Sequence, residues 1–216
     1  MKVVVIGATG FVGQNLVEEF KNRGHQVVAI AKDTSLVPNK GNVTSINVDI
    51  KDVNALATVL KGNDVVISAF NAGWTNPNLY NDFLSGSKAI QEAVKASGVK
   101  RFIVIGGAGS LYIAPNTQVV DTPDFPKEYY AGASAARDYL NIIKEEKKID
   151  WTFFSPALEM HPGITINRTG KYRLGLDNPV FNTEGRSILS VEDVAVVIAD
   201  EVENPKHSQV RFTAGY

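Results

Sequence analysis

The chain has 216 residues, of which 44% are hydrophobic and 21% charged, and its formal net charge is −1. This nearly neutral charge gives no electrostatic reason to expect a nucleic acid or an anionic membrane as a partner. The chain has no cysteine, which excludes disulfides, thiolate metal sites and a cysteine nucleophile, and we expect no metal cofactor.

No stretch approaches the roughly 20 apolar residues of a membrane span. The apolar run after Lys2 stops at Gly7, which is too short for a signal peptide. We therefore expect a cytoplasmic protein that acts on a small molecule.

Short apolar runs alternate with segments of helical period from Met1 to about Pro156. The expected strands are Val3–Ile6, Val27–Ala31, Val43–Val48, Val65–Ala69, Phe102–Ile105 and Trp151–Phe154. The expected helices are Val12–Arg23, Val53–Lys61, Asn78–Ser97 and Tyr129–Lys147. The strands are apolar on both faces, which is typical of parallel strands covered by helices. Their alternation with helices predicts an α/β fold, a Rossmann-type doubly wound parallel sheet.

The pattern changes after Pro156. Residues 157–187 are rich in Gly, Pro, Asn and Thr and are expected to form loops and short strands. Ser190 and Asp193 have the spacing of a capping box for a helix that runs to about Val202, and Val210–Thr213 is a candidate final strand. No linker interrupts the chain, so we expect one domain over residues 1–216. In it, residues 157–216 form a substrate-side lobe with the final helix.

A glycine-rich turn follows the first strand and opens the first helix: Gly7-Ala8-Thr9-Gly10-Phe11-Val12-Gly13. Gly7 permits a tight turn, Gly10 lets the backbone approach a pyrophosphate, and Gly13 lets helix and strand pack closely. The N–H groups of the helix N-terminus, with their partial positive charge, favour phosphate. We expect Thr9, Phe11 and Val12 to contact the same cofactor, a nicotinamide dinucleotide.

The second strand ends in Ala31, Lys32 and Asp33. An NAD-selective site usually has an acidic residue at this strand end, to hold the ribose 2′-hydroxyl. Ala31 stands at that position and Lys32 can pair with a 2′-phosphate, so we expect NADPH to be preferred over NADH. The alternative is that Lys32 is a solvated surface lysine and Asp33 reaches the ribose.

Other strand ends supply the remaining cofactor contacts. Asp49 is placed to hydrogen-bond the adenine amino group, with helix capping toward Asp52 as the alternative. The further expected contacts are Ile50, Ala69, Phe70 and Gly106.

The chain resembles an atypical short-chain dehydrogenase/reductase, and more closely the NADH-flavin reductase group related to biliverdin reductase B. Besides the glycine turn, the matching segments are Gly106–Leu111, Asp150–Ala157, Thr169–Tyr172 and Ser187–Ala195. They extend over almost the whole chain. The resemblance implies the Rossmann-type fold and a bound dinucleotide, with Ser155, Pro156 and Ala157 against its nicotinamide end. It does not define the substrate.

Two departures from the classical short-chain dehydrogenase/reductases bear on the chemistry. Classical members carry Tyr-x-x-x-Lys on the helix before the sixth strand, and the lysine lowers the pKa of a tyrosine that acts as acid or base. Here Tyr129 is followed four positions later by Ala133, and Tyr130 by Ser134. The serine that usually ends the fifth strand is also missing, and Ser110 follows three residues after Gly106-Gly107.

Three residues are candidates for contacts with the substrate or for catalysis, each with a plainer alternative. Ser110 could hydrogen-bond the substrate or the nicotinamide amide, or cap a turn. Tyr130 could orient or stack on a ring, or be an amphipathic residue at a helix start. His161 could donate a proton near neutral pH, or be an ordinary loop histidine. Trp74, after the fourth strand, could wall the substrate pocket or serve packing alone.

These observations favour an NAD(P)H-dependent reductase of a flavin, a quinone or a similar flat acceptor, because such acceptors have little need for a tuned protein acid. A non-catalytic dinucleotide-binding sensor is the first alternative, and a sugar-nucleotide epimerase or dehydratase is the second. The sequence leaves the oligomeric state open.

Overall fold

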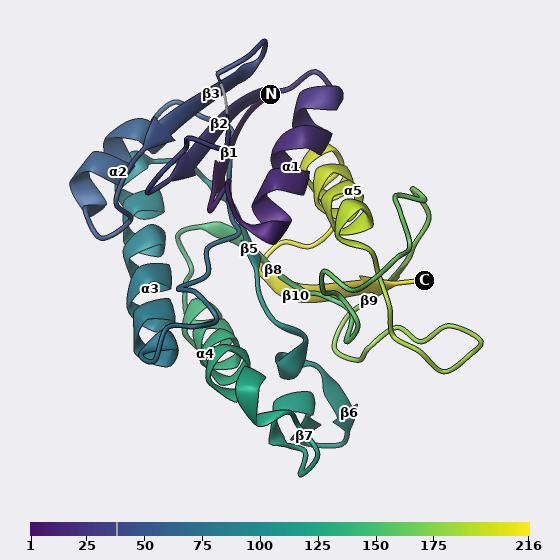
Figure 1. Cartoon of the computed structure of the whole chain (residues 1–216). Helices are drawn as coiled ribbons and strands as arrows, with labels where there is room; N and C mark the ends of the chain where they lie inside the picture. Colours follow the sequence, from purple (N-terminus) through teal and green to yellow (C-terminus); the bar gives the residue numbers. More distant parts are fainter. Residues whose placement is uncertain (38) are drawn as a thin grey trace.

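The computed structural model describes residues 1–37 and 39–216. Its main sheet has eight strands in the order β3-β2-β1-β4-β5-β8-β10-β9. All neighbours pair in parallel except β9, which runs antiparallel to β10. The strands are β1 (Lys2–Ile6), β2 (Gln26–Ala31), β3 (Val43–Asn47), β4 (Val65–Ser68), β5 (Arg101–Ile105), β8 (Asp150–Ser155), β9 (Arg173–Gly175) and β10 (Val210–Gly215). The predicted Rossmann-type parallel sheet is confirmed (Figure 1).

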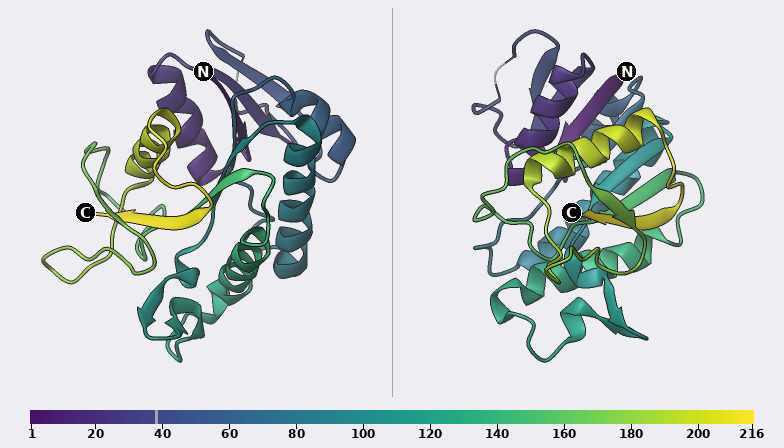
Figure 2. Two further views of the ribbon diagram at one scale, coloured as in Figure 1. Left: turned by 180° about the vertical axis from the view of Figure 1, so that it is seen from behind. Right: turned by 90° about the vertical axis from the view of Figure 1, so that its right-hand side faces the viewer.

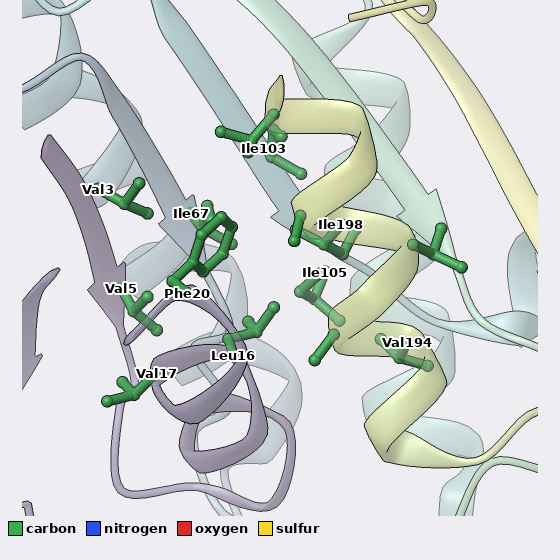
Figure 3. Packing of buried hydrophobic residues seen from close by; sticks show 14 of the residues in the cluster. Val3, Val5, Leu16, Val17, Phe20, Ile67, Ile103, Ile105, Val194 and Ile198 are labelled. Atoms are coloured by element: carbon green, nitrogen blue, oxygen red, sulfur yellow. The ribbon is translucent and has the colours of Figure 1, made fainter. Parts of the chain in front are cut away.

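Helices cover both faces of this sheet, as Figure 2 shows. They are α1 (Phe11–Asn22), α2 (Val53–Leu60), α3 (Leu79–Ser97), α4 (Lys127–Ile143) and α5 (Val191–Glu203). Helices α1 and α5 pack on one face, where Leu16 and Phe20 of α1 and Ile198 of α5 belong to one apolar cluster with Val3 and Val5 of β1 (Figure 3). Helices α2, α3 and α4 share a second apolar cluster with the opposite face. The strands are buried on both sides for this reason, which explains their continuous apolar sequence.

The helix and strand ends differ from the sequence prediction by a few residues. Helix α4 begins at Lys127 rather than Tyr129, directly after Pro126, which has a fixed φ and no N–H to leave unpaired. It ends at Ile143, four residues before the predicted Lys147. Helix α5 begins as predicted, because the Ser190 hydroxyl accepts a hydrogen bond from the Asp193 N–H at 3.1 Å.

Several short elements were not predicted. A two-stranded hairpin, β6 (Tyr112–Ala114) with β7 (Thr117–Gln118), lies between two 3₁₀ turns, η1 (Ala108–Ser110) and η2 (Val119–Asp121). Strand β9, at the edge of the main sheet, is one of the short strands expected within residues 157–187, although its position was not predicted. These elements are two or three residues long and partly exposed, so their sequence carries no apolar run.

The loops between β8 and α5 gather around the N-terminal end of α5 and the C-terminal end of β10 (Figure 1). The buried Asp193 carboxylate fixes them by accepting hydrogen bonds from the Thr169 N–H and hydroxyl, the Gly170 N–H and the Tyr216 hydroxyl. Burial raises the pKa of Asp193, but these hydrogen bonds outweigh it, and the net pKa lies below its ordinary value. The predicted lobe is therefore tied to the first turn of α5.

No helix in the described part of the chain is long and apolar enough to cross a membrane. The cytoplasmic location remains a prediction.

Candidate functional site

The site lies at the carboxyl edge of the parallel strands. The strand order reverses between β1 and β4, because β2 and β3 extend the sheet on one side and β5 and β8 on the other. The segments that leave β1 and β4 diverge there but stay in contact, since the Ala69 N–H donates to Ile6 O at 2.9 Å. Such a reversal opens a crevice in which doubly wound folds bind their ligands.

The glycine-rich turn, Gly7–Gly13, lies where the strand order reverses. Close contacts with neighbouring backbone atoms require two of its glycines. Gly7 has φ of +80°, and a Cβ there would lie 2.6 Å from Ala69 O. A Cβ on Gly13 would lie 2.0 Å from Gly7 O. Gly10 differs, because it is exposed and an added Cβ would meet only Gly7 O, at 3.3 Å. The fold itself therefore needs Gly7 and Gly13, whereas Gly10 leaves the space outside the turn clear.

The turn presents N–H groups to that space. Gly10 is the N-cap of α1 and has no side chain to satisfy them. Among the described residues, the N–H groups of Thr9, Phe11, Val12 and Gly13 have no hydrogen-bond acceptor. Unpaired N–H groups at the positive end of a helix suit an anionic ligand. The space outside the turn, which a Cβ on Gly10 would enter, is lined by these N–H donors. It therefore fits the pyrophosphate of a dinucleotide.

The end of β2 shows how the predicted ribose-binding residues lie. Ala31 is buried and has no carboxylate to offer, and Lys32 is exposed. The Asp33 carboxylate accepts a hydrogen bond from the Ser35 N–H at 2.9 Å, which lowers the pKa of Asp33. In this arrangement the Asp33 carboxylate stabilises the turn that follows β2.

Asp49 and two other predicted cofactor contacts, Ile50 and Phe70, follow the ends of β3 and β4. Strand β3 ends at Asn47, so Asp49 lies beyond it, and its exposed carboxylate accepts from the Lys51 N–H at 2.9 Å. Asp52 is the residue that caps α2. Ile50 and Phe70 both lie against Gly86 of α3, where an added Cβ would be 2.6 Å from the Phe70 ring and 2.9 Å from Ile50 Cδ1. The adenine contact of Asp49 and the cofactor contacts of Ile50 and Phe70 remain predictions.

The ends of β5 and β8 hold the residues predicted for the nicotinamide side. The glycine at position 106 is required by the Phe153 ring, which an added Cβ would approach to 2.0 Å. The Ser110 hydroxyl is fully buried, donates to Gly107 O at 3.0 Å and lies 3.0 Å from Ser155 Oγ. This geometry matches the turn-capping alternative for Ser110. Ser155, Pro156 and Ala157 are buried as well, at the carboxyl end of β8.

The other two candidate catalytic residues lie apart from Ser110. Tyr130 is in the first turn of α4 and half exposed, and His161 is in an exposed loop with Nδ1 accepting from the Gly163 N–H at 3.1 Å. Within residues 1–37 and 39–216, no hydrogen bond joins any two of Ser110, Tyr130 and His161. Their catalytic roles therefore remain predictions.

One buried residue near the site was missed by the sequence reasoning. The Arg211 guanidinium, on β10, donates to Ser110 O at 2.9 Å and pairs with Asp177, the residue that also binds the Tyr112 N–H through its carbonyl. Arg211 thus connects the turn after β5 to the hairpin and to the loop after β9. An arginine inside a predicted strand is the only sequence signal, and it does not reveal these partners.

The fold, with its glycine-rich turn at the strand-order reversal, is that of a Rossmann-type dinucleotide-binding protein. Comparisons with known proteins agree. The profile of the NAD(P)H-binding family matches residues 7–205. The uncharacterized protein YwnB of Bacillus subtilis is 37% identical over 99% of this chain and 97% of its own length. The chain belongs to the NAD(P)H-binding family, and its cofactor is a nicotinamide dinucleotide.

Several solved structures cover all of this chain, and two of them share more than a third of its sequence and carry a provisional activity. One, from Bacteroides thetaiotaomicron and provisionally named an epimerase, has a TM-score of 0.91 at 42% identity over 96% of its own chain. The other, from Streptococcus pneumoniae and provisionally named an NADH-flavin reductase, has a TM-score of 0.85 at 35% identity over 99% of its own chain.

Proposed function

We propose that this protein is a reductase that uses NADPH in preference to NADH and delivers hydride to a flavin, a quinone or a similar flat acceptor. When bound, the reduced nicotinamide supplies the hydride, and a quinone that takes this hydride and one proton from water becomes a hydroquinone. The name of the Streptococcus pneumoniae relative is consistent with this chemistry.

The observation that carries the proposal is the surroundings of Tyr130. The position where related enzymes have a lysine is Ser134, and its hydroxyl donates to Tyr130 O at 2.6 Å within the helix. In the described residues no side chain hydrogen-bonds the Tyr130 hydroxyl. A carbonyl reductase must protonate an alkoxide and an epimerase must deprotonate a hydroxyl, so both depend on a tuned acid or base. A flavin or quinone acceptor has much less need of one.

The preference for NADPH rests on the end of β2. Ala31 has no carboxylate to accept hydrogen bonds from a ribose diol or to repel a 2′-phosphate. Asp33 is engaged by Ser35, which leaves the exposed Lys32 ammonium as the nearby charge that could pair with the phosphate. Because a partly exposed pair of this kind is worth only about 1 kcal/mol, the preference should be modest, on the order of tenfold.

An acceptor panel tests the proposal. Purified protein is mixed with NADPH or NADH and with FMN, FAD or menadione, and oxidation of the nicotinamide is followed at its absorbance band. We expect oxidation with at least one acceptor, and a higher kcat/KM for NADPH than for NADH. Tight NADPH binding by calorimetry without oxidation by any of these acceptors would overturn the proposal and support a non-catalytic sensor.

A further inference from the structure

Four aromatic side chains gather where α4 begins, and three of them are at least half exposed. Trp74, Tyr129 and Tyr130 are 57%, 51% and 50% exposed, and Phe125 is partly exposed. We call these four residues the aromatic shelf. Large aromatic rings are usually buried or engaged in an interface, so a group of them left in solvent indicates a binding surface.

The rings of the shelf are arranged in two edge-to-face pairs. Trp74 and Tyr129 have ring centroids 5.7 Å apart and planes at 87°, and Phe125 and Tyr130 have centroids 6.5 Å apart and planes at 70°. These pairs hold the rings in fixed orientations without covering them on both sides. The backbone of α4 helps, because Gly132 makes room for the Trp74 indole: a Cβ there would lie 2.7 Å from the ring.

Two segments of the chain connect the shelf to the carboxyl edge of the sheet. Trp74 follows β4 by six residues, in the segment whose Ala69 carbonyl touches Gly7 of the phosphate-binding turn. Helix α4 is held against the turn after β5, since a Cβ on Gly109 would lie 2.9 Å from Ala133 Cβ, one turn along the helix from Tyr129. The shelf therefore borders the carboxyl edge of β4 and β5.

We propose that the aromatic shelf is the acceptor subsite, and that Trp74 with Tyr129 binds a flat conjugated ring such as a quinone or an isoalloxazine. This proposal rests on the reductase function proposed above. Its basis is the match between an exposed, rigidly oriented pair of rings and a planar ligand that can stack on them. Stacking is insensitive to the acceptor's substituents, so the subsite would accept several ring systems of this shape.

Trp74 also provides the readout, because the chain has only two tryptophans and the other, Trp151, is 2% exposed. Menadione is titrated into the protein without any nicotinamide while tryptophan emission is recorded. We expect quenching that saturates in the wild type and is absent from Trp74→Phe, in which Trp151 remains as the reference. Quenching that grows linearly without saturation reports collisions alone and would overturn the proposal.

Steady-state kinetics with menadione tests the same residues. Trp74→Ala should raise the KM for menadione about tenfold, which corresponds to ~1.4 kcal/mol, with the dissociation constant of NADPH unchanged. Trp74→Phe should lose less, since it keeps a ring. Gly132→Ala should also raise this KM, because its methyl group displaces the indole while the helix keeps its fold by circular dichroism. Val210→Ala, an exposed change at the opposite edge of the sheet, is the control.

The outcomes separate this proposal from the reductase function. If Trp74→Ala reduces menadione with an unchanged KM, the shelf is not the acceptor subsite although the protein is a reductase. If the wild type reduces no acceptor but Trp74 still shows saturable quenching, the shelf binds a ring and the reductase function is wrong. Absence of both turnover and saturable quenching would overturn the subsite.

Discussion

Replacing Gly10 by valine separates cofactor binding from folding. Gly10 has φ of −80° and ψ of 170°, which any residue can adopt, and the added Cβ would meet only Gly7 O at 3.3 Å. Valine is a poorer N-cap than glycine, so we expect a loss of stability of about 1 kcal/mol or less. The substitution should leave the fold intact.

Binding should suffer much more than folding. The valine methyl groups would occupy the space in front of the unpaired N–H groups of Thr9, Phe11, Val12 and Gly13. A hydrogen bond to a charged group is worth roughly 1.5–3 kcal/mol, so the loss of a single N–H to phosphate contact weakens binding at least tenfold. Displacement of the whole pyrophosphate would cost more.

Calorimetric titration with NADPH measures this loss, and circular dichroism reports the fold. Glu18→Ala is the matched control, because Glu18 is an exposed residue of the same helix whose ion-pair partner is Lys21, in the next helical turn. The dissociation constant of NADPH from the Glu18→Ala protein should equal that from the wild type. Unchanged NADPH affinity in a folded Gly10→Val protein would refute the assignment of this turn as the phosphate site.

Three further predictions follow from the same geometry. Lys32→Ala should weaken NADPH binding up to about tenfold and leave NADH binding nearly unchanged, and high salt should reduce this difference. An equal rise of both dissociation constants would show that Lys32 does not bind a 2′-phosphate. Tyr130→Phe should lower kcat with menadione by far less than the roughly 10²–10⁴-fold typical of a lost general acid, and a loss of that size would make Tyr130 catalytic. Asp193→Asn should lower the free energy of unfolding by about 3 kcal/mol, because buried donors lose a charged acceptor. The folded-state pKa of Asp193 is depressed, so its contribution is present above the unfolded value of about 3.9 and is lost as the pH falls through the folded value. The free energy of unfolding, measured with urea between pH 7 and 3, should therefore fall less with decreasing pH in Asp193→Asn than in the wild type. Parallel plots of this free energy against pH for the two proteins would contradict the account.

The sequence predicted the main sheet well because its strands are buried on both faces. Val3–Ile6 and Val65–Ile67 are continuous apolar runs, and Gly98, with φ of 79°, ends α3 where a left-handed cap is needed. The glycine-rich turn after β1 was predictable for a similar reason, since backbone geometry imposes glycine at positions 7 and 13. Local sequence determines these features.

Features that depend on distant pairing were not predictable. Strand β9 exists because three residues pair with β10, and nothing within Arg173–Gly175 signals this partner. The capping role of Ser190 was evident from local spacing, but the hydrogen bonds that Asp193 accepts from Thr169 and Gly170 join segments more than 20 residues apart. The burial of Ser110 likewise depends on Ser155 and Arg211 from two other strands.

The most direct test of the proposed function is a single turnover in an anaerobic stopped-flow experiment. The protein is loaded with NADPH, or with NADPH deuterated at the transferred position of the nicotinamide, and mixed with menadione. The account predicts that menadione is reduced, that deuterium slows this reduction, and that Tyr130→Phe shows nearly the same rate and isotope effect. A protein that binds NADPH but leaves menadione and the other flat acceptors unreduced would contradict it.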